Sequence, residues 1–207
     1  MSADSPTDLP TVADELYGLD PGEFTEQRDR HGRAAKERGN DELARQIGAL
    51  RKPTTAAWAV NLLARRRRAD LGRLFSLAEQ MRAAPGRRER GDLRELNRMA
   101  QRVVTGLVRL AGELAGQQDR ALTQSMLDQV HQTLRAAMAD PAAADAVLSG
   151  RLTTTLQAGG LAGLDVSAAV AVPTSVTSLA SRGRPQRADD RGSRRDWERA
   201  LRAARAA

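Results

Sequence analysis

The chain has 207 residues, a formal net charge of +7, five aromatic residues and no cysteine. The lack of cysteine excludes disulfide scaffolds, thiolate metal sites and thiol catalysis. The sequence contains no apolar run of the roughly 18 residues that a membrane-spanning helix needs, and its first residues lack the pattern of a signal peptide. We therefore expect a cytoplasmic protein with no membrane partner.

Charge is unevenly distributed along the chain. Residues 1–50 sum to −5 (6 basic, 11 acidic), residues 51–110 to +10 (15 and 5), residues 111–179 to −3 (3 and 6) and residues 180–207 to +5 (9 and 4). Of the basic residues 31 are Arg, a skew that GC-rich coding also produces. Two basic blocks separated by an acidic stretch are expected for a polyanion partner, although an exposed Arg-rich helix face gives the same sums.

The first third of the chain is predicted to be helical after a disordered tail of residues 1–10. Asp20 and Pro21 favour a helix start with Asp20 as the capping residue, and Gly39 tolerates the left-handed conformation in which helices end. Thr54 or Thr55 is expected to cap a helix that carries Trp58. The other helices predicted here cover residues 11–19, 21–39 and 41–52.

The longest predicted helix covers residues 88–115. Apolar residues recur along it at intervals that alternate between 3 and 4 residues, which is the heptad pattern of a coiled coil. These residues are Leu93, Leu96, Ala100, Val103, Leu107, Leu110 and Leu114. A second apolar stripe widens this face, which favours packing inside a bundle. We expect a returning helix over 122–139 to complete a long antiparallel hairpin. A short helix from Asp140 to Ser149 and one or two helical turns over 152–157 should follow.

The predicted fold class is therefore all-α, a helical bundle with a long antiparallel helical hairpin and a flexible basic C-terminal arm. The bundle is expected over residues 11–158. Residues 159–195 have the Gly, Ser, Thr and Pro content of a flexible linker, and residues 196–207 are expected to form a short C-terminal helix. Residues 166–172 alternate like a strand, but an extended arm is preferred because no partner strand is apparent.

No residue pattern predicts catalysis. The two histidines, His31 and His131, are too few for a multi-histidine metal site, and Asp128 with His131 supplies only half of a helical metal site. Nucleotide-binding, zinc-protease and serine-hydrolase motifs are missing from the sequence. We therefore expect a non-enzymatic protein with no catalytic residue, no metal and no cofactor.

Residues Arg182, Gly183, Arg184 and Pro185 spell RGRP, which resembles the core of the AT-hook. In that motif the glycine lets an extended backbone lie near the floor of an A·T minor groove, and the arginines insert along the groove. The following Gln186 and the nearby acidic residues depart from the motif. The alternative interpretation is a basic linker that only aids solubility.

Residues 42–48, ELARQIG, resemble the opening of a helix-turn-helix. Lys52 and Pro53 lie where that motif has its second helix junction, so a plain helix hairpin is the preferred interpretation. Two nearby basic sets are candidate phosphate contacts: Arg65, Arg66, Arg67 and Arg68, and also Arg51 with Lys52 before a helix N-terminus. Arg51 and Lys52 are equally favourable as cations at the end of the preceding helix.

Three longer strings carry a broader resemblance: LYGLDPGEFTEQRD (16–29), ALRKPTTAAWAVNLLAR (49–65) and ADPAAADAVLSGRL (139–152). They are similar to a family of actinobacterial helical proteins, rich in Ala and Arg, that has no assigned function. The resemblance spans roughly residues 11–165. It implies a helical fold and brings no catalytic residues to this chain.

These features predict a nucleic-acid-associated protein whose partner is double-stranded DNA. Arg65 to Arg68 and the arginines between Arg87 and Arg98 would contact phosphates, and the RGRP arm would enter a minor groove. The alternative is a helical adaptor that binds a helical protein through its amphipathic hairpin and tail helix. Trp197 and Leu201 would be the partner-binding residues in that case.

Overall fold

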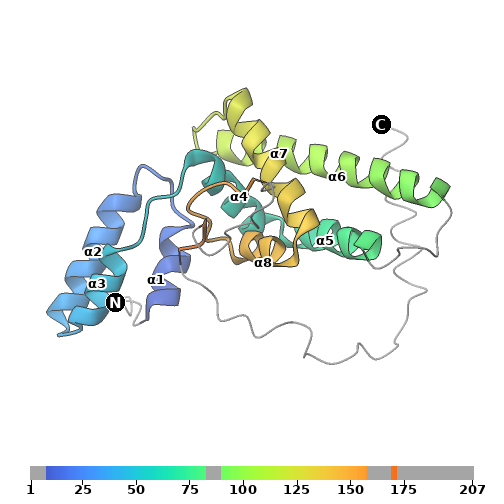
Figure 1. Cartoon of the computed structure of the whole chain (residues 1–207). Helices are drawn as coiled ribbons and strands as arrows, with labels where there is room; N and C mark the ends of the chain where they lie inside the picture. The colour runs from blue at the N-terminus through green and yellow to red at the C-terminus, as the bar shows by residue number, and fades with distance from the viewer. Residues whose placement is uncertain (1–7, 83–89, 158–168, 172–207) are drawn as a thin grey trace. The chain divides into compact units, whose positions relative to one another are not determined.

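The computed structural model describes residues 8–82, 90–157 and 169–171, with side chains described from residue 94 onward in the second range. Over these residues the fold is all-α, as predicted, and has eight helices (Figure 1). The helices are α1 (Leu9–Leu16), α2 (Phe24–Glu37), α3 (Asp41–Gly48), α4 (Thr55–Arg66), α5 (Arg68–Arg82), α6 (Arg90–Gly116), α7 (Gln124–Ala139) and α8 (Pro141–Ser149). None of these described helices is long and apolar enough to cross a membrane.

Helices α1 to α3 enclose a small core of their own, which we call the α1–α3 core. Its largest members are Tyr17 and Phe24, whose rings meet edge to face with centroids 5.2 Å apart. Ile47 of α3 is fully buried beside them, and Leu43 and Leu50 complete the apolar face predicted from their spacing. Edge-to-face rings supply a large apolar area in a small volume, so three short helices can share one core.

Helices α4 to α8 surround a second, larger core, which we call the α4–α8 core. Helix α4 is its centre, because it contacts α5, α6, α7 and α8. The predicted helix that carries Trp58 is α4, and all nine residues from Ala56 to Ala64 are buried. Many residues in this core are alanines, which let the neighbouring helices approach α4 closely from every side.

Several helix ends follow the predicted signals. Thr54 caps α4 by accepting a hydrogen bond from the Ala57 amide at 3.2 Å, and Asp140 caps α8 with Pro141 as its first residue. Gly39 and Gly150 have φ values of 74° and 64°, in the left-handed region that favours glycine. Asp20 was predicted to cap a helix that starts at Pro21, but residues 21–23 form a turn and α2 begins at Phe24. The Asp20 carboxylate accepts hydrogen bonds from the Gly22 amide and from Arg120.

The segment 152–157 was predicted to be helical, and this prediction was wrong. Leu152 forms an isolated antiparallel bridge with Val170, which belongs to the alternating sequence for which no partner strand was expected. The amide side chain of Asn61, fully buried in α4, donates to the Leu152 carbonyl at 3.0 Å and accepts from its N–H at 2.9 Å. Since Asn61 satisfies both backbone groups, Leu152 needs no helical partners.

Helices α6 and α7 are packed neighbours, and Gly112 of α6 lies against Leu127 of α7. The prediction that they form one long antiparallel hairpin stays a prediction. Val103 belongs to the predicted seam of α6 but is 36% exposed, whereas Val104 is buried. The linker of residues 159–195 lies outside the described residues except for 169–171, and the predicted helix over 196–207 lies wholly outside them.

Candidate nucleic-acid interface

One face of α6 carries a line of arginines, which we call the arginine stripe: Arg94, Arg98, Arg102 and Arg109. All four are exposed. Their spacings of 4, 4 and 7 residues place them within an arc of roughly 80° on a helix of 3.6 residues per turn. The buried residues of α6, such as Ala100, lie on its opposite side. The stripe exists because α6 is amphipathic and buries only the apolar side in the α4–α8 core.

The stripe is largely free of acidic partners. Arg109 forms an ion pair with Glu113 one turn later, at 3.6 Å. Among the described residues Arg94, Arg98 and Arg102 have no ion pair and no side-chain hydrogen bond. From residue 94 onward α6 carries four arginines against Glu95 and Glu113, so this face keeps a positive excess. Unpaired guanidinium groups on a solvent-facing helix are available to phosphate oxygens.

The sequence anticipated only part of this stripe. Arg94 and Arg98 fall in the predicted range, and Arg87 and Arg88 lie outside the described residues. Arg102 and Arg109 were missed, because that interpretation followed the local density of Arg instead of its spacing. The repeat of arginines every four residues from Arg94 was the available signal.

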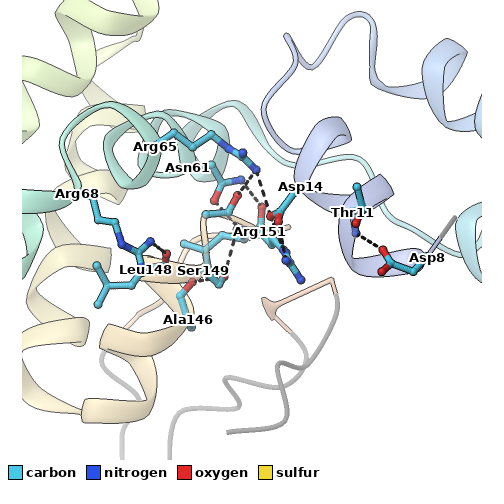
Figure 2. Close-up of polar contacts among 12 residues, drawn as sticks. Asp8, Thr11, Asp14, Asn61, Arg65, Arg68, Ala146, Leu148, Ser149 and Arg151 are labelled. Atoms are coloured by element: carbon cyan, nitrogen blue, oxygen red, sulfur yellow. Dashed lines mark hydrogen bonds and ion pairs between the residues drawn. The ribbon is translucent and has the colours of Figure 1, made fainter. Parts of the chain in front are cut away.

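The predicted cluster Arg65 to Arg68 is divided by the fold (Figure 2). Arg65 donates to the Gly150 carbonyl at 3.3 Å and Arg68 donates to the Leu148 carbonyl at 2.8 Å. These carbonyls belong to the end of α8, where backbone acceptors lack helical partners and cations are favourable. Arg66 and Arg67 are exposed, with no side-chain hydrogen bond in the described part of the chain.

Arg65 also belongs to an ion-pair group around Asp14 of α1 (Figure 2). The Asp14 carboxylate accepts two hydrogen bonds from Arg151, at 2.7 and 2.9 Å, and lies 3.9 Å from an Arg65 nitrogen. Burial lowers the pKa of the Arg65 guanidinium; the charge of Asp14 opposes this and the charge of Arg151 adds to it. Sequence reasoning missed Arg151 and Asp14, since they are far apart in the chain and neither lies in a motif.

Arg51 and Lys52 are exposed in the connection between α3 and α4. The Arg51 carbonyl accepts a hydrogen bond from the Tyr17 hydroxyl at 2.5 Å, which ties this connection to the α1–α3 core. The positive charge of Lys52 contributes to lowering the pKa of Asp20, whose main cause is the hydrogen bond from Arg120. The fold thus keeps both side chains exposed beside the start of α4.

The other predicted site residues lie outside the described residues: Arg182, Gly183, Arg184, Pro185, Trp197 and Leu201. The helix-turn-helix resemblance falls on α3 and α4. A recognition helix needs an exposed face for a groove, and nine consecutive residues of α4 are buried. We therefore propose no helix-turn-helix function for α3 and α4.

The histidines lie in two separate helices. His31 of α2 contacts the Glu15 carboxylate at 3.3 Å, and Asp128 beside His131 accepts a hydrogen bond from Gln124. Over residues 8–82, 90–157 and 169–171, no three His, Cys, Asp or Glu residues are grouped as a metal ion would require. Comparisons with protein-family models, curated proteins and solved structures find no match.

Proposed function

We propose that this protein associates with nucleic acid, with double-stranded DNA as the expected partner, and catalyses no reaction. The observation that carries the proposal is the arginine stripe of α6, in which Arg94, Arg98 and Arg102 are exposed and unpaired within the described residues. Phosphate contacts of this kind supply most of the affinity of sequence-independent binding. The proposal includes no cofactor and no metal, and it places the protein in the cytoplasm.

The dimensions of the stripe support the proposal. Fifteen residues separate Arg94 from Arg109, which corresponds to about 22 Å along a helix. Duplex DNA carries one negative charge for about every 1.7 Å of its axis, so a stripe of this length faces several phosphates. The contacts would position the protein without reading the bases, because guanidinium groups on phosphates carry no sequence information.

Arg66 and Arg67 are the members of the 65–68 cluster that remain available for phosphate. Arg65 and Arg68 are tied to the end of α8 and enter the proposal only as supporting charges. The RGRP segment would add contacts in an A·T-rich minor groove through Arg182 and Arg184.

The direct test measures binding of a fluorescent DNA duplex by anisotropy at about 50 mM salt. The variant Arg94→Gln/Arg98→Gln/Arg102→Gln removes three positive charges from the stripe. We expect it to weaken binding at least about tenfold for every sequence, as for loss of phosphate contacts. A wild-type protein that binds no duplex at this salt would overturn the proposal.

A matched control removes the same charge elsewhere. Arg30, Arg33 and Arg45 are exposed on α2 and α3, in the acidic first part of the chain. The variant Arg30→Gln/Arg33→Gln/Arg45→Gln should bind within about twofold of wild type, because these residues lie off the stripe. Equal weakening by both triple variants would show that only net charge matters and would contradict a specific interface on α6.

The minor-groove part of the proposal has its own test. Arg182→Ala with Arg184→Ala should remove any preference for A·T-rich over G·C-rich duplexes and leave the stripe-dependent affinity in place. A preference that survives this double substitution would contradict the role of the RGRP segment.

A groove between α5, α6 and α7 favours a second candidate function, a helical adaptor. Its volume is about 280 Å³, its floor includes Met81, Val104 and Met138, and Arg82 and Arg135 border it. None of the described residues that line it is acidic, so its partner would be an acidic helix with a bulky apolar side chain. If the protein binds such a helix and the Arg135→Gln variant binds it equally well, this candidate is excluded.

A further inference from the structure

A second pocket opens where the end of α8 faces α1 and α4 (Figure 2). Its volume is about 590 Å³, and its lining includes Asp14, Arg65, Arg68, Leu148, Gly150 and Arg151. Three of these side chains are guanidinium groups and one is a carboxylate. The lining therefore carries a net charge of +2.

The pocket already holds one oxyanion, the carboxylate of Asp14. Arg151 grips it with two parallel hydrogen bonds, at 2.7 and 2.9 Å, and Arg65 lies 3.9 Å from one of its oxygens. The Arg151 side chain is 13% exposed and that of Arg65 is 28% exposed, whereas Asp14 is 52% exposed. The two arginines are thus held in place by the fold, and their anionic partner lies on the solvent side.

The arginines keep donors to spare. A guanidinium has five N–H groups, and Arg65 and Arg68 each use one of them on a carbonyl at the end of α8. Figure 2 shows Arg68 directed toward Leu148, on a different part of the lining from Arg65 and Arg151. Capping of α8 therefore accounts for the position of these side chains and leaves most of their hydrogen-bonding capacity unused.

Charge decides which anion fits better. Asp14 supplies one negative charge to two guanidinium groups, those of Arg65 and Arg151, and the charge of Arg151 works with burial to lower the pKa of Arg65. A phosphate monoester carries close to two negative charges at neutral pH and has three strong acceptor oxygens. Arg pairs with phosphate through the same two-pronged geometry that it uses with a carboxylate.

We propose that this pocket is a binding site for a phosphate group, which replaces the Asp14 carboxylate on Arg65 and Arg151. The site goes beyond the proposed association with DNA and does not depend on the arginine stripe. Because Asp14 belongs to α1, phosphate in the pocket competes with an ion pair that joins α1 to α8 and α4.

The test titrates the full chain with inorganic phosphate by isothermal calorimetry, up to about 10 mM, which detects dissociation constants in the millimolar range. Wild type should bind one phosphate. Asp14→Asn should tighten binding about tenfold, because it removes the competing carboxylate and keeps the shape of the side chain. Arg151→Gln should weaken binding about tenfold, because it removes the guanidinium group that donates two hydrogen bonds to the oxyanion.

Asp29→Asn is the matched control for Asp14→Asn. Asp29 also pairs with an arginine, Arg28, at 2.8 Å, so its replacement makes the same change of charge away from the pocket. We expect this control to bind phosphate as wild type does. The proposal is overturned if Asp14→Asn binds no phosphate, or if the Asp29 control tightens binding as much as Asp14→Asn does.

Two further measurements distinguish a site for free phosphate from the DNA binding proposed above. The stripe variant Arg94→Gln/Arg98→Gln/Arg102→Gln should keep its affinity for inorganic phosphate, whereas Arg151→Gln should keep its affinity for a DNA duplex within about twofold. If Arg151→Gln instead loses duplex binding as strongly as the stripe variant does, the pocket holds the phosphodiester backbone and a free-phosphate site is contradicted.

Discussion

The α1–α3 core and the α4–α8 core are built from different types of apolar side chain. The α1–α3 core has nine buried members and depends on the paired rings of Tyr17 and Phe24. The α4–α8 core has 27 buried members, is dominated by Ala, Leu and Val, and surrounds α4 completely. A small core needs large side chains, whereas a large core can use small ones because each helix has several neighbours.

The two regions differ in charge as well. Residues 1–50 sum to −5, and residues 51–110 sum to +10. Ion pairs connect the α1–α3 region to residues beyond it: Asp14 contacts Arg65 and Arg151, and Asp20 contacts Arg120. The acidic region thus neutralises a few arginines of the other region by direct contact, and the arginine stripe of α6 is not among them.

The largest expected effects come from truncating the central aromatic residue of each core. Trp58→Ala and Phe24→Ala should each cost about 3–5 kcal/mol, since both side chains are fully buried. Hydrogen exchange should distinguish them. Phe24→Ala should expose the amides of α1 to α3, and Trp58→Ala should expose those of α4 to α8. Equal loss of protection in both regions after Phe24→Ala would contradict two separate cores.

Trp58 offers an internal control for this prediction. Its indole N–H is buried and has no hydrogen-bond partner in the described part of the chain. An unsatisfied buried donor costs about 1–3 kcal/mol, so Trp58→Phe should destabilise far less than Trp58→Ala.

Asn61→Ala should have the next largest effect, about 2–4 kcal/mol, because it leaves the buried N–H and C=O of Leu152 without partners. Urea unfolding followed by circular dichroism measures this cost. Asn97→Ala is the matched control, since Asn97 is exposed on α6 and should change stability by less than about 0.5 kcal/mol. A cost for Asn61→Ala as small as the control's would contradict the role of this side chain.

The left-handed glycines allow one matched comparison between the regions. Gly39→Ala and Gly150→Ala should each cost about 1–2 kcal/mol, because a Cβ is strained at φ values of 74° and 64°. A Cβ at Gly39 would meet nothing within 4 Å, and one at Gly150 would make ordinary contacts, the nearest at 3.6 Å to Ala64. Urea unfolding of both variants checks this, and a variant as stable as wild type would show that backbone strain is absent at that site.

The smallest expected effect concerns the ion pair between Asp20 and Arg120. The hydrogen bond from Arg120 holds the pKa of Asp20 below its ordinary value of 3.8. The stabilisation is therefore present above that pH and is lost as the pH falls through the lowered pKa. Asp20→Asn should cost about 1 kcal/mol at pH 7 and less at about pH 2. Unfolding curves at both pH values test this, and a cost that does not shrink in acid would contradict it.

Local signals in the sequence predicted much of the fold. The caps at Thr54 and Asp140 and the left-handed Gly39 act within a few residues, so the sequence alone reveals them. The extended path of Leu152 depends on Asn61, which lies 91 residues earlier, and no local pattern records such a contact. The same reason explains why the pairing of Asp20 with Arg120, 100 residues later, was not predicted.

The candidate interface was predictable where periodicity encodes it. Arg98 and Arg102 follow Arg94 at helical spacing, and a helix that buries its apolar side must expose them. The fate of Arg65 and Arg68 was not predictable, because their carbonyl partners at Gly150 and Leu148 come from a helix about 80 residues later. The density of charge in a sequence locates the basic residues, but it does not show which of them form hydrogen bonds within the protein.

The central claim is that unpaired arginines of α6 neutralise DNA phosphates. The most direct test is the slope of log Kobs for duplex binding against log salt concentration, measured for wild type and for Arg94→Gln/Arg98→Gln/Arg102→Gln. Each phosphate contact contributes about 0.9 to this slope, so we predict a wild-type slope that is steeper by about 2.7. Identical slopes for the two proteins would contradict the claim.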